Sequence, residues 1–132
     1  MRVVVDTNVF VSSFFGGYPR KVIDLWKKGE IALCLTSPIV QEYVEVLSRM
    51  GLVGEPELED LLDLFRKNFN ALFTAKTPKI EVVRDPDDNK FIECAVALKA
   101  DCIVSGDRDL TVLKNYMGIS ISTPKQFVLK FA

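Results

Sequence analysis

The stretch RDPDDNKFIECAVALKADCIVSGDRDL, residues 84–110, decides how the rest of the chain is interpreted. It runs from an acidic turn through an apolar segment of helical length to a short β-branched run, 102–104, and a second acidic turn. In an α/β domain a helix returns the chain antiparallel to the strand that follows it, so both turns reach the same edge of the sheet. We therefore expect Asp88 in the first turn to meet Asp107 in the second.

The N-terminal segment MRVVVDTN brings a third acid to this edge. Residues 2–5 are typical of a buried strand, and Asp6 follows at its carboxyl end, where open α/β sheets place ligands. A fourth acid, Glu42, lies near the start of the helix predicted after Ser37, which we expect to cap that helix, with Pro38 in its first turn. The helix dipole alone also favours an acid there, so the pattern leaves both explanations of Glu42 open.

Length and composition indicate a single domain, residues 1–132. The chain has 132 residues, of which 48% are hydrophobic and 27% charged, an ordinary globular profile. We find neither a signal pattern nor an apolar run long enough to span a bilayer, and we expect a cytoplasmic protein without a membrane partner. Three scattered cysteines are expected to be buried structural thiols.

The absence of histidine restricts the chemistry. It excludes histidine-based triads, acid-base pairs and metal sites. The formal net charge of -1 gives no general attraction to nucleic acid, so such a partner would need local basic patches or a metal ion.

Periodicity along the rest of the chain predicts alternating strands and helices around a parallel sheet. We expect an irregular segment over 8–18 and a capping role for Asp87 or Asp88. The expected strands are 2–5, 31–35, 80–83, 100–104 and 119–122, and the expected helices are 19–28, 37–49, 56–73, 89–99, 110–114 and 124–131.

Acids brought within a few ångströms repel one another at neutral pH, so some must be protonated unless a cation is present. The set gathered at this edge consists of Asp6, Glu42, Asp88 and Asp107, with Asp109 as a candidate fifth member. Mg²⁺ and Mn²⁺ prefer oxygen ligands and are held by a few carboxylates plus substrate phosphate. Such an ion lowers the pKa of water and stabilises a leaving oxygen in phosphodiester hydrolysis.

At these residues the chain resembles the PIN domain family. The resemblance is carried by VVVDTNVF at the start, by a Glu in the helix after the second strand, by the DxxFIECAVALKAD segment and by IVSGDRDL. It spans nearly the whole chain and looks most similar to stand-alone PIN proteins that act as VapC-type toxins of toxin–antitoxin pairs.

The resemblance implies a three-layer α/β/α fold with a central parallel sheet of four to five strands flanked by helices. It implies a Mg²⁺- or Mn²⁺-dependent ribonuclease, an RNA substrate, a homodimer and a cognate antitoxin protein. The acids it carries over as catalytic metal ligands are Asp6, Glu42, Asp88 and Asp107. Asn8 and Ser105 would be polar neighbours, Asp109 would be the second acid of an Asp-x-Asp ending, and Asp85 and Asp87 would serve capping or positioning.

Rival interpretations come from other classes of protein. A haloacid-dehalogenase-like phosphatase typically has a second Asp two residues after the first, where this chain has Asn8, and a phosphorylated receiver domain would need an acidic pair that is missing here. A stronger alternative is a non-catalytic PIN-like module that binds RNA or a protein, although its acids are intact.

Overall fold

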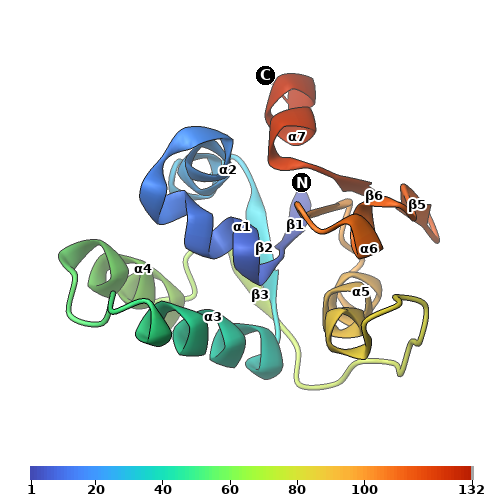
Figure 1. The fold of residues 1–132 in the computed structure, drawn as a ribbon, viewed down its shortest axis with the longest axis horizontal. Coiled ribbons are helices and arrows are strands. Elements are labelled where there is room, and N and C mark those ends of the chain that lie inside the picture. Colours follow the sequence, from blue (N-terminus) through green and yellow to red (C-terminus); the bar gives the residue numbers. More distant parts are fainter. Residues whose placement is uncertain (132) are drawn as a thin grey trace.

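A computed structural model describes residues 1–131, and its centre is a sheet of six strands in the order β3-β2-β1-β4-β6-β5 (Figure 1). All neighbouring strands are parallel except β5 and β6, which are antiparallel. The expected four to five strands become six because both edge strands, β3 and β5, were missed in the sequence, while the expected strand over 80–83 does not form. The strands are β1 (Arg2–Val5), β2 (Ala32–Leu35), β3 (Ala71–Phe73), β4 (Cys102–Val104), β5 (Asn115–Tyr116) and β6 (Ile119–Ser122).

Helices cover both faces of the sheet, which confirms the predicted α/β class and PIN-like architecture. In Figure 1, α2 and α7 pack together above the strands, and α3 and α5 lie below them. The elements are α1 (Thr7–Ser12), η1 (Ser13–Phe15), α2 (Gly17–Lys27), α3 (Ser37–Arg49), α4 (Pro56–Arg66), η2 (Pro86–Asp88), α5 (Asn89–Ala97), α6 (Arg108–Thr111) and α7 (Pro124–Phe131). Within residues 1–131, no helix has the length and apolar character needed to cross a membrane.

The core forms where the central strands meet the helices that follow them. All three valines of β1 are fully buried, as expected for a parallel strand covered on both faces. The rings of Phe10 and Tyr43 stack with centroids 4.2 Å apart, and the Tyr43 hydroxyl donates to the carbonyl of Val5 at the end of β1. This contact fixes α3 against the strand that delivers Asp6. The three cysteines are free and buried, as expected.

The predicted helix over 56–73 is wrong in its second half. Helix α4 ends at Arg66, and Asn68 and Asn70 follow with φ of 53° and 42°, left-handed values that asparagine tolerates better than most residues. The chain then forms β3, which pairs with β2. Apolar residues continue from the helix into the strand, so the apolar pattern did not show where the helix ends. The two asparagines mark that boundary.

Two other segments also differ from expectation. Residues 80–83 form no strand; instead the backbone N–H groups of Val82 and Val83 donate to Asn89 Oδ1 at 3.1 and 2.9 Å. A side chain of α5 thus replaces a neighbouring strand as hydrogen-bond partner. The segment 8–18, expected to be irregular, is largely helical.

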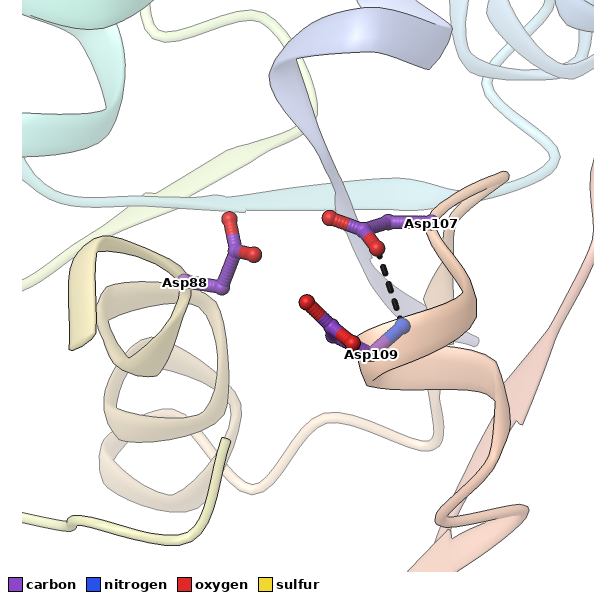
Figure 2. Close-up of side chains that lie close together, drawn as sticks. All are labelled: Asp88, Asp107 and Asp109. Carbon is purple, nitrogen blue, oxygen red and sulfur yellow. Dashed lines mark hydrogen bonds between the residues drawn. The ribbon is translucent and has the colours of Figure 1, made fainter. Parts of the chain in front are cut away.

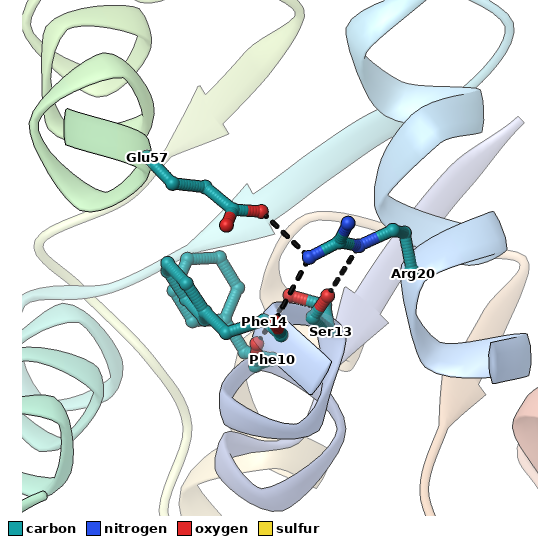
Figure 3. Close-up of polar contacts among 5 residues, drawn as sticks. All are labelled: Phe10, Ser13, Phe14, Arg20 and Glu57. Atoms are coloured by element: carbon teal, nitrogen blue, oxygen red, sulfur yellow. Dashed lines mark hydrogen bonds and ion pairs between the residues drawn. The ribbon is translucent and has the colours of Figure 1, made fainter. Parts of the chain in front are cut away.

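Arg20 stabilises this helical segment. Its Nε donates to the carbonyl of Ser13 at 2.8 Å, and its Nη2 donates to the carbonyl of Phe14 at 2.9 Å and to Glu57 Oε1 at 2.9 Å (Figure 3). One guanidinium therefore satisfies two carbonyls at the end of a helix. It also ties that end to α4.

Candidate metal centre

The sheet order brings the predicted acids to one edge. Strands β1 and β4 are parallel neighbours with Val5 opposite Val104, so Asp6 and the Ser105–Asp107 turn leave the sheet side by side. Helix α5 runs back along these strands and contacts both, which places Asp88 at the same end. The juxtaposition of Asp88 and Asp107 expected from residues 84–110 is present.

Asp6 is buried and held rigidly at the start of α1. Its Oδ1 accepts from the backbone N–H of Val9 at 2.8 Å, and its Oδ2 accepts from the Ser105 hydroxyl. Burial raises the pKa of Asp6 from 3.8 to about 6, although these hydrogen bonds lower it and nearby Asp107 raises it further. The carboxylate of Asp6 is thus in an environment that disfavours its charge unless a cation compensates it.

Asp88, Asp107 and Asp109 form a tighter cluster (Figure 2). Each offers one carboxylate oxygen, and these three oxygens lie within 4.8 Å of one another. Asp107 caps α6 because its Oδ1 accepts from the backbone N–H of Asp109 at 2.9 Å. Desolvation, followed by the contact with Asp107, raises the pKa of Asp88 to about 7. These oxygens are close enough to share one ion.

Asp88 occupies the capping position of α5, as predicted, but its side chain makes no capping hydrogen bond. The capping bond of the turn comes from Asp85, whose Oδ1 accepts from the backbone N–H of Asp87 at 3.1 Å. Asp85 therefore has the capping role expected for it. The Asp88 carboxylate remains available to the cluster.

Glu42 lies between the starts of α1 and α5, outside the trio of aspartates. Its Oε1 accepts from the Thr7 hydroxyl, and its Oε2 pairs with Lys90 Nζ. The helix start differs by one residue from expectation, since Thr36 rather than Ser37 is the capping residue and makes no side-chain bond. Sequence reasoning missed Thr7 and Lys90, although each lies one or two residues after a predicted acid.

The accessory residues occupy different environments. Ser105 is fully buried, and besides donating to Asp6 it accepts from the backbone N–H of Asp107 at 2.9 Å. Asn8 is exposed in the first turn of α1. Arg84, which sequence reasoning did not select, places its Nε 3.3 Å from Asp109 Oδ1, with most of its side chain exposed. The cluster therefore has a fixed inner side, formed by Ser105, and a solvent-facing side.

The donor set suits a hard divalent cation. All the clustered side chains present carboxylate oxygens, the ligands of Mg²⁺ and Mn²⁺. Desolvation raises the pKa of Asp6 and that of Asp88, and the neighbouring carboxylates raise both further, as expected for acids that are buried and gathered without compensating charge. A divalent ion at Asp88, Asp107 and Asp109 would relieve this repulsion.

Comparison with known proteins decides the family. The PIN domain family matches residues 2–109, a range that includes every acid of the site. The chain belongs to the PIN domain family. PIN domains are in general nucleases that use a divalent metal.

A relative matches the chain over nearly its full length. An uncharacterized protein of Methanocaldococcus jannaschii is 33% identical over 145 aligned positions, which cover 99% of this chain and 92% of that protein. No solved structure matches the chain. This PIN domain therefore has a relative of similar length whose name records no activity.

Proposed function

We propose that this PIN domain is a Mg²⁺- or Mn²⁺-dependent endoribonuclease and the toxin of a toxin–antitoxin pair. The observation that carries the hydrolytic part is the trio of carboxylate oxygens from Asp88, Asp107 and Asp109 within 4.8 Å of one another. It lies at the edge where β1 delivers Asp6. A carboxylate cluster without histidine suits metal-assisted phosphodiester hydrolysis better than any histidine-dependent reaction.

Each side chain has a defined part in this proposal. Asp88, Asp107 and Asp109 would hold the ion, which when bound supplies an activated water and positive charge for the leaving oxygen. Asp6 completes the set from the buried side, oriented by Ser105 and Val9. Glu42 and the exposed Asn8 lie close by in α3 and α1, where RNA would pass.

A surface groove that has Glu42 in its lining supports an extended substrate. It has a volume of about 870 Å³ and runs along α3, lined by residues that include Glu42, Ser48, Arg49 and Lys90. Arg49 offers positive charge to a phosphodiester backbone, whereas the ammonium of Lys90 is already paired with Glu42. We propose that RNA flanking the scissile bond occupies this groove.

The test is cleavage of a fluorescent single-stranded RNA with Mg²⁺ or Mn²⁺ added, in the wild type and in Asp6→Asn and Asp88→Asn. We expect loss of at least ~10²-fold in both variants, the low end for removal of a positioned catalytic group. Asp60→Asn, an exposed position in α4, is the matched control. A single-stranded DNA of the same sequence distinguishes a ribonuclease from a general nuclease.

Full activity in both variants would refute the assigned roles. RNA binding without cleavage at any metal concentration would favour the alternative of a non-catalytic PIN-like module. The toxin role predicts growth arrest on expression, relieved by a small protein encoded next to this chain. The homodimer proposed with it is checked by light scattering of the purified protein.

A further inference from the structure

The most shielded ion pair of residues 1–131 joins Lys90 and Glu42. Their side chains are 19% and 29% exposed, whereas in each of the other four pairs at least one partner is more than 40% exposed. Ion pairs at the surface contribute little to stability. A charge as shielded as that of Lys90 instead requires a partner, because losing the partner leaves it uncompensated.

Lys90 is held in this position from several sides. It lies in the first turn of α5, two residues after Asp88, and its Nζ is 5.4 Å from the centroid of the buried Phe91 ring. Its Nζ contacts Glu42 Oε2 while the Thr7 hydroxyl donates to Glu42 Oε1. Both oxygens of Glu42 are thus bonded to groups of the chain itself.

The aspartates differ from Glu42 in this respect. Asp88, Asp107 and Asp109 have carboxylate oxygens facing one another, and Asp88 and Asp107 have no cationic partner among the ion pairs of the described residues. The acids therefore form two groups. In one group Glu42 is balanced by an ammonium of the chain. In the other, Asp109 faces the exposed Arg84, and Asp88 and Asp107 require an external cation.

We propose that Lys90 supplies the positive charge that Glu42 would otherwise take from a second divalent ion, so the site binds one divalent ion, on its aspartates. Lys90 is then a positioning residue that keeps Glu42 on Thr7 and α5. Glu42 acts through these contacts rather than as a direct ligand. This inference rests on the proposed metal-dependent function. It adds the number of divalent ions that the proposed nuclease would use.

The test counts Mn²⁺ ions bound per full-length chain, by equilibrium dialysis with electron paramagnetic resonance of free Mn²⁺. We expect one ion in the wild type, two in Lys90→Met, and one in Lys90→Arg, which keeps the charge. The double variant Glu42→Gln/Lys90→Met should return to one. Lys79→Met, which breaks an exposed pair with Glu81, is the control and should bind one.

Other counts have separate consequences. Two ions in the wild type, or one in a folded Lys90→Met, would overturn this inference and leave the proposed nuclease standing. No ion in the wild type would overturn both. If Lys90→Met does not fold, Glu42→Gln gives the decisive measurement: a Mn²⁺ dissociation constant within about threefold of wild type supports the inference, and a loss of about tenfold or more overturns it.

Discussion

Replacing Asp6 by asparagine should stabilise the metal-free protein at neutral pH although the same change removes a proposed catalytic group. Asparagine has almost the same shape, its side-chain oxygen can still accept from the backbone N–H of Val9, and its amide can donate to Ser105 Oγ. The substitution removes the buried negative charge and also the acceptor of the Ser105 hydroxyl. Because the loss of the acceptor is the same at every pH, the difference between acid and neutral pH isolates the cost of the charge.

The magnitude follows from the pKa of Asp6, which burial raises from 3.8 to about 6. A shift of one pKa unit corresponds to about 1.4 kcal/mol, so the charge of Asp6 costs about 3 kcal/mol above pH 6. The folded state holds the proton more tightly than the unfolded chain, so the free energy of unfolding falls as pH rises from about 4 to about 6. Below pH 4 both states are protonated and the cost disappears.

The measurement is urea unfolding in EDTA at pH 4 and pH 7.5, followed by the fluorescence of Trp26, which is the single tryptophan and fully buried. We expect Asp6→Asn to exceed wild type in free energy of unfolding by up to about 3 kcal/mol at pH 7.5 and to match it within about 1 kcal/mol at pH 4. The pKa of Asp88 is raised in the same direction, first by desolvation and in a smaller part by the charge of Asp6, so relief of that repulsion adds to the gain in Asp6→Asn. A variant less stable than wild type by the same amount at both pH values would refute the reasoning.

Two further predictions concern metal removal and the core. Mn²⁺ at a hundredfold excess over its dissociation constant should raise the free energy of unfolding of the wild type by about 2.7 kcal/mol. Asp107→Asn should lose most of this gain in urea unfolding at pH 7.5. An equal gain in the variant would contradict the role of Asp107 as a metal ligand. Tyr43→Phe should lower the free energy of unfolding by about 1–3 kcal/mol, because the buried carbonyl of Val5 loses the hydroxyl that donates to it. A change below about 0.5 kcal/mol would show that this carbonyl does not need the Tyr43 hydroxyl.

The sequence predicted the meeting of Asp88 and Asp107 better than it predicted the edges of the sheet. Strand β6 and helix α7 have the predicted bounds, because Pro124 marks the start of the helix and an apolar run marks the strand. Asp88 and Asp107 meet because a buried strand and its preceding helix impose that geometry. Predicting that these two distant residues meet requires only the order of helices and strands along the chain.

The missed features depend on contacts that no local pattern contains. Strand β3 forms because β2 has a free edge with which it can pair. The apolar spacing of the same residues also fits one face of a helix. Residues 80–83 lose their predicted strand to hydrogen bonds with Asn89. The pairing of Lys90 with Glu42 joins residues 48 positions apart, and only the packing of α3 against α5 brings them together.

Capping a helix and belonging to the acidic group, which look like alternative explanations of an aspartate in a sequence, are combined in this cluster. Asp6 and Asp107 each use one oxygen to accept from the backbone of the helix that follows, and this bond fixes the side chain while the carboxylate stays within the acidic group. Asp88 makes no such bond, and desolvation together with Asp107 raises its pKa. Acids at helix starts therefore lead to this cluster, and the acid without a capping bond has the carboxylate that no backbone N–H of its helix compensates.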